Sequence, residues 1–90
     1  MKYQNKERSI EFTTLLDEGE NASVFHHFKN KDYRIITIAK HSETLEELVV
    51  YHEIGNMSHC CARPIDMFFS KVDKEKYPEV TQEYRFEKIK

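Results

Sequence analysis

A succession of short strand-forming segments, separated by turn residues, is the feature that most constrains how this chain can fold. Tyr, Ile, Thr and Val are concentrated in residues 32–41 and 46–54, Val24 with two Phe marks residues 23–29, and a shorter segment covers 58–62. Such residues suit a pleated, half-buried surface. Because no long stretch has helical periodicity, the sequence predicts several antiparallel strands.

Turn-forming residues separate these segments. Asn30-Lys31 and Gly55-Asn56 are two-residue turn candidates, since Asn and Gly tolerate positive φ. Arg63-Pro64 should end the fourth strand, and Pro64 suits the start of one helical turn over residues 64–69. Residues 83–89 alternate well enough for a closing strand, and residues 69–72 are a weaker candidate for pairing.

Ninety residues are enough for one small core. Short strands with tight turns indicate a barrel or a sandwich, and a barrel of about five strands leaves no exposed edges. The predicted organisation is a mostly β domain over residues 23–90, with residues 1–22 as an N-terminal extension packed on its outside. Residues 10–16 fit either a strand or a helix, and the sequence does not decide between them.

Charge and cysteine content limit the classes of partner. The net charge is −2, and residues 24–72 and 73–90 are each electrically balanced. The chain therefore lacks the basic excess of a duplex-DNA binder. The N-terminus has no apolar signal segment and no stretch is long enough to span a membrane. We expect a cytoplasmic protein with no membrane association, and a weak homo-oligomer is compatible with these features.

The spacing of the His and Cys residues does not indicate a metal site or a catalytic thiol. The five histidines and the adjacent Cys60 and Cys61 do not form the C-x-x-C or H-x₃₋₅-H patterns of zinc sites. Adjacent cysteines rarely bridge each other, so we expect two reduced thiols. On a strand, His59 faces the same side as Cys61, but no activating partner for either thiol is evident. We therefore predict no catalytic cysteine, no metal and no cofactor.

One ordered series of residues carries a family resemblance. It consists of Phe25, His27, Phe28, Lys29, Asn30 and Tyr33, then His41, Ser42, Glu43, Thr44, Glu47, Val50 and Tyr51, then Arg63, Pro64, Met67 and Phe68. This series resembles the bacterial domain-of-unknown-function family 1653 over about residues 24–72. The resemblance implies an SH3-like barrel and no established activity. Two departures from the family pattern are Asn30, where the family has Gly, and Cys61-Ala62, where it has Trp-Val.

Polar and aromatic residues in this series are the candidate ligand-binding set: His27, Lys29, Tyr33, His41, Glu43, Glu47, Tyr51 and Arg63. The planar fork of Arg63 suits a carboxylate or a phosphate. An equally open interpretation is a structural network in which Arg63 pairs with an acid of residues 43–47. A regular hairpin about Gly55-Asn56 predicts that Arg63 lies opposite Leu48, within reach of those acids. Ser42, Glu43 and Thr44 also have the chemistry of an ordinary turn.

Three functions follow from these features. The leading hypothesis is a non-enzymatic binding or interaction module that presents a polar and aromatic surface to a protein, a peptide or a nucleic-acid segment. The alternative is a site for a nucleotide-like or other small anionic ligand, held by Lys29 and Arg63. An enzyme that uses His27 or His41 as a base ranks last, because so small a barrel encloses little volume.

Overall fold

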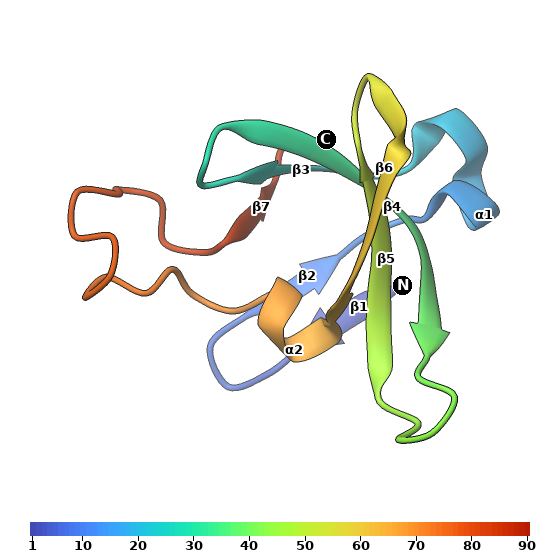
Figure 1. The fold of residues 1–90 in the computed structure, drawn as a ribbon, viewed down its shortest axis with the longest axis horizontal. Coiled ribbons are helices and arrows are strands. Elements are labelled where there is room, and N and C mark those ends of the chain that lie inside the picture. Colours follow the sequence, from blue (N-terminus) through green and yellow to red (C-terminus); the bar gives the residue numbers. More distant parts are fainter.

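Five antiparallel strands form the main sheet, in the order β6-β5-β4-β3-β7 (Figure 1). The computed structural model describes residues 1–90, apart from the side chain of Glu18. The strands of the sheet are β3 (Val24–His27), β4 (Lys31–Lys40), β5 (Glu47–Glu53), β6 (Asn56–Pro64) and β7 (Phe86–Lys88). Before them come a hairpin of β1 (Lys2–Gln4) and β2 (Ser9–Glu11), the short helix α1 (Leu15–Glu18) and a 3₁₀ turn (Gly19–Asn21). Helix α2 (Ile65–Phe68) follows β6.

Local turn chemistry explains the hairpins. The β3–β4 turn consists of residues 28–30, and Asn30 ends it with φ 68°. Gly55, with φ 89°, turns the chain between β5 and β6. Both conformations are ones that Asn and Gly adopt at low cost. The predicted mostly β fold of about five strands, with a helical turn after Pro64, is confirmed.

The sheet is open and does not close into the predicted barrel. Strands β6 and β7 are its two edges, and each pairs on one side only among the described strands. Strand β7 has only three residues, and these pair with β3. The rings of Phe68 and Phe86 stack on the inner side of the sheet, with their centroids 4.0 Å apart. These bulky side chains occupy the interior that the sheet would enclose if it closed into a barrel. The gap between β6 and β7 is called the seam below.

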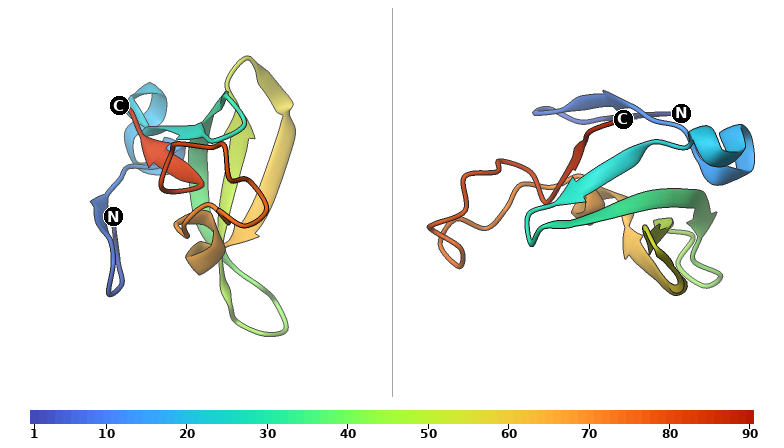
Figure 2. Two further views of the ribbon diagram at one scale, coloured as in Figure 1. Left: turned by 90° about the vertical axis from the view of Figure 1, so that its left-hand side faces the viewer. Right: turned by 90° about the horizontal axis from the view of Figure 1, so that it is seen from above.

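Aromatic rings dominate the core. Phe25, Phe68, Phe69 and Phe86 are all fully buried, and Tyr51 joins the same cluster. Tyr3 of β1 and Phe12, which directly follows β2, join this cluster. The β1–β2 hairpin lies beside β3 and β7 (Figure 2). Residues 1–22 therefore share one core with the sheet.

The N-terminal segment contains both elements that its sequence left open. Strand β2 ends at Glu11, and helix α1 begins at Leu15. The Thr14 hydroxyl accepts a hydrogen bond from the Asp17 amide and caps this helix. No helix among the described residues has the length and apolar character needed to cross a membrane.

Candidate anion-binding pocket

A cavity of about 230 Å³ lies at the seam of the sheet. Three segments meet there: the β3–β4 turn, the inward side of β6, and the connection from α2 to β7. The lining residues are His27, Phe28, Lys29, Arg63, Asp73, Lys76, Tyr77 and Arg85. We call this cavity the seam pocket.

Arg63 reaches the seam pocket because of the strand register. It lies opposite Val49, a fully buried core residue, and not opposite Leu48 as predicted. The prediction was wrong for two reasons: the turn consists of Ile54 and Gly55, so that Glu53 lies opposite Asn56, and a bulge between His52 and Glu53 then moves the pairing to His52 opposite Cys60. The net displacement from the predicted register is one residue. A shift of one residue reverses the face that a side chain occupies. Arg63 therefore projects inward, where its guanidinium carbon is 5.5 Å from the Phe86 ring centroid.

The ion pair predicted for Arg63 is not formed. The carboxylates of residues 43–47 are all described, and none of them is within ion-pair distance of Arg63. The loop that holds them is organised by His41, whose Nδ1 atom accepts hydrogen bonds from the Glu43 and Thr44 amides. The predicted pairing of Arg63 with an acid of residues 43–47 is therefore wrong.

The outer wall of the seam pocket is a tied loop of residues 73–83. Its ends meet where the Val72 amide bonds the Glu83 carbonyl. Within the loop, Lys74 Nζ donates to the carbonyls of Val80 and Gln82 at 2.6 and 2.7 Å. Gln82 Nε2 donates to the His26 carbonyl at 3.0 Å and fastens the loop to β3. Compact loops with closed ends often carry functional residues.

Positive charge predominates in the seam pocket. Four cationic side chains line it, from Lys29, Arg63, Lys76 and Arg85, against the single carboxylate of Asp73. None of the four forms an ion pair with a described residue. Asp73 Oδ1 is already used, since it accepts hydrogen bonds from the Glu75 and Lys76 amides.

Arg85 is the least satisfied of these cations. Its Nε atom is buried and has no hydrogen-bond partner within the described part of the chain. A buried donor without an acceptor costs roughly 1–3 kcal/mol, and more when it is charged. A buried donor of this kind calls for an explanation, and an acceptor supplied by a bound ion is one. Arg34 Nε and His52 Nε2, which lie outside the pocket, are buried without a partner in the same way.

Aromatic rings hold the two lysines at the rim. Phe28 and Tyr77 pack edge to face with centroids 4.9 Å apart. Lys29 Nζ lies 5.5 Å from the Tyr77 ring centroid, and Lys76 Nζ lies 5.6 Å from the same centroid. Cation–π contacts of this kind position an ammonium group without neutralising its charge.

His27 is neutral at physiological pH. Burial, followed by the nearby charges of Arg63 and Lys29, lowers its pKa from 6.5 to about 4. Its Nδ1 atom accepts a hydrogen bond from the Lys29 amide at 3.1 Å. The proton of the neutral ring is therefore assigned to Nε2, which makes that atom a donor.

Comparison with known proteins gives one match. Residues 23–88 match the model of a family described as "Protein of unknown function (DUF1653)". The chain belongs to this family. No curated protein and no solved structure matches it.

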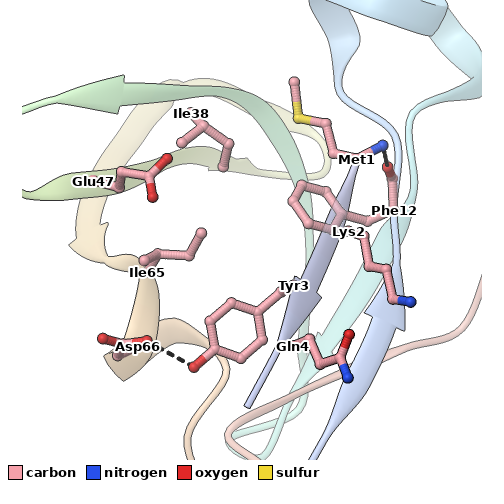
Figure 3. A pocket seen from close by; sticks show the side chains of 9 residues that line it. All are labelled: Met1, Lys2, Tyr3, Gln4, Phe12, Ile38, Glu47, Ile65 and Asp66. Atoms are coloured by element: carbon pink, nitrogen blue, oxygen red, sulfur yellow. Dashed lines mark hydrogen bonds between the residues drawn. The ribbon is translucent and has the colours of Figure 1, made fainter.

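The two cavities of this DUF1653 protein differ in how many of their lining residues fall within the family match. All eight residues that line the seam pocket lie within residues 23–88. A larger cavity of about 620 Å³ lies between the β1–β2 hairpin and the sheet (Figure 3). Its lining includes Met1, Lys2, Tyr3, Gln4 and Phe12, which precede the matched residues. Charges of both signs line this larger cavity, and Asp66 already accepts a hydrogen bond from the Tyr3 hydroxyl (Figure 3).

The eight candidate residues from the sequence fall into separate places. His27, Lys29 and Arg63 meet in the seam pocket. Tyr33 and Tyr51 pack edge to face behind it, with centroids 5.3 Å apart, and Tyr51 is part of the core. His41 and Glu43 lie in the β4–β5 loop, whereas Glu47 lines the larger cavity.

Four lining residues from the 73–85 region were not among those predicted from the sequence: Asp73, Lys76, Tyr77 and Arg85. Their segment is electrically balanced, so no charge excess distinguished the two cations that face the pocket. Both cysteines are free thiols, at positions 60 and 61. Among the described residues, no three His, Cys, Asp or Glu side chains are grouped to hold a metal ion.

Proposed function

We propose that this protein is a non-enzymatic binding module whose seam pocket takes an anionic group of a small ligand. The observation that carries the proposal is the convergence of Lys29, Arg63, Lys76 and Arg85 on one cavity without ion-pair partners among the described residues. Like charges held together repel one another, so an anion in the pocket lowers their free energy. Arg guanidinium groups also bind two oxygens of a carboxylate or phosphate at once.

The size of the pocket supports a small ligand. Liquid water occupies about 30 Å³ per molecule. A cavity of about 230 Å³ therefore corresponds to roughly eight waters. This volume suits one anionic group with a small carrier. Outside the pocket the other ten Lys and Arg residues are outnumbered by fifteen Asp and Glu residues, which also argues against an extended polyanion such as duplex DNA.

Isothermal titration calorimetry at low ionic strength tests the proposal. Inorganic phosphate, sulfate and citrate are each titrated into the wild type, into the double variant Arg63→Gln/Arg85→Gln, and into Lys40→Gln. Lys40 is an exposed cation at the end of β4, outside the pocket, so it controls for loss of charge alone.

We expect at least one anion to bind the wild type and Lys40→Gln alike, with at least about tenfold weaker binding to the double variant. Equal binding of every anion to all three proteins would overturn the proposal, as would no binding to the wild type.

A further inference from the structure

We infer that the group taken by the seam pocket is a tetrahedral oxyanion without a proton, chemically the dianion of a small phosphate monoester. This inference rests on the proposed function and narrows its ligand class. Its basis is the hydrogen-bonding character of the pocket, which consists almost entirely of donors, and the directions from which those donors come.

Donors surround the cavity. Lys29 and Lys76 carry ammonium groups, and Arg63 and Arg85 carry five N–H donors each. His27 adds its Nε2–H, because its Nδ1 already accepts from the Lys29 amide. The carboxylate of Asp73 is the one charged acceptor in the lining, and its Oδ1 is used by the Glu75 and Lys76 amides. A ligand that accepts at every oxygen fits this lining better than one that must also donate.

The donors also come from separate segments. His27 ends β3, Lys29 lies in the β3–β4 turn, and Arg63 comes from an edge strand. Lys76 and Arg85 come from the connection between α2 and β7. Donors supplied by separate segments suit oxygens arranged in three dimensions, whereas one Arg fork is enough to match a planar carboxylate.

Charge favours the dianion over a monoanion. The pocket has an excess of three positive charges when His27 is neutral. A phosphate monoester carries close to two negative charges above its second pKa of about 6, whereas a phosphodiester carries one. The protonated monoester also carries an O–H group, and this hydrogen-bond donor would face the N–H donors of the pocket without an acceptor. Selectivity for the monoester dianion over the diester is therefore expected.

Calorimetric titration of the wild type with methyl phosphate, dimethyl phosphate and sulfate tests this inference. At pH 7.5 we expect methyl phosphate to bind at least about tenfold more tightly than dimethyl phosphate, because the diester loses one charge and one accepting oxygen. Between pH 5.0 and 7.5 the affinity for methyl phosphate should rise about tenfold, following the dianion fraction.

Sulfate is the control for titration of the protein itself, because it stays dianionic over this range. The groups that face His27 are Arg63, Lys29, Arg85 and His26, and Asp73 and Lys76 complete the pocket. Any change in their protonation alters sulfate and methyl phosphate binding together. We expect the sulfate affinity to change less than threefold.

Two results would overturn the inference while the proposed function stands: dimethyl phosphate binding as tightly as methyl phosphate, or citrate binding while methyl phosphate and sulfate do not. If no anion distinguishes the wild type from Arg63→Gln/Arg85→Gln, the inference and the proposed function fail together.

Discussion

The guanidinium carbon of Arg63 lies 5.5 Å from the ring centroid of Phe86, although the two residues belong to opposite edge strands of the sheet. This contact bridges the seam between β6 and β7. In a closed barrel these two edge strands would pair and there would be no seam. The contact places a cation beside His27, whose ring centroid is 4.6 Å from that of Phe86. The open edge of the sheet thereby creates the seam pocket.

Arg85→Gln should not destabilise the protein in the absence of an anion. The substitution removes one of four like charges and an Nε atom that is buried without an acceptor among the described residues. We expect the free energy of unfolding to stay the same or to rise by about 1 kcal/mol. Urea denaturation in a buffer free of phosphate and sulfate measures it. A loss of more than 1 kcal/mol would show that Arg85 is a structural residue.

His27 should make the stability depend on pH in a defined window. Its folded pKa of about 4 lies below its ordinary value of 6.5, mainly because of burial. Below pH 6.5 the unfolded chain therefore binds a proton that the folded chain does not, and unfolding becomes easier. The stability from this residue is complete above pH 6.5 and is lost as the pH falls towards 4.

The matched variant for that test is His27→Asn, because the Asn side-chain oxygen can replace Nδ1 as acceptor for the Lys29 amide. Urea unfolding at pH 7.0 and 4.5 should show a smaller loss of stability for the variant than for the wild type. An NMR titration midpoint of His27 near 6.5 would contradict this account.

Tyr3→Ala should destabilise the whole domain. The Tyr3 ring stacks on Phe69 with centroids 4.5 Å apart, and its hydroxyl donates to Asp66 at 2.7 Å. Loss of a buried aromatic ring costs about 3–5 kcal/mol. Tyr3→Phe keeps the ring and should cost only about 1–2 kcal/mol, from the loss of the hydroxyl's hydrogen bonds to Asp66 and from Asn5 Nδ2. Thermal unfolding followed by circular dichroism gives both values; equal small losses would mean that residues 1–22 do not share the core.

Leu45→Gly should stabilise the β4–β5 loop. Leu45 has φ 63° and is 67% exposed, so it carries the steric cost of the left-handed region without burying its side chain. That steric cost is about 1–2 kcal/mol. Replacement by Gly removes it, but part of the gain is offset because Gly loses more conformational entropy on folding. We expect a net gain of about 0.5–1 kcal/mol in chemical denaturation. Asn30→Gly, at φ 68°, is the comparison, with a smaller change because Asn tolerates this region.

The turns of the fold could be predicted from single residues, whereas the register between strands β5 and β6 could not. Asn30 and Gly55 identified their turns because a positive φ favours these residues. The register shift beside His52 has no comparable signal, and it places Val49 opposite Arg63 in place of the predicted Leu48. The sequence therefore identified Arg63 as a candidate binding residue but assigned it the wrong neighbours.

The candidate site was predictable only in part for the same reason. His27, Lys29 and Arg63 belong to the series that resembles the family, and the structure brings them together. Lys76 and Arg85 come from a region whose charges balance, and their position depends on bonds such as that from Gln82 to the His26 carbonyl. Such long-range contacts leave no pattern in the local sequence.

The central claim is that the seam pocket binds an anion, and an NMR titration tests it most directly. Methyl phosphate is added to ¹⁵N-labelled protein at pH 7.5, and the backbone amide shifts are followed. We predict saturable shifts concentrated at residues 27–29, 63, 76–77 and 85, and their loss in Arg63→Gln/Arg85→Gln but not in Lys40→Gln. Shifts that are absent, that do not saturate, or that centre on the larger cavity around Tyr3 and Ile65 would contradict the claim.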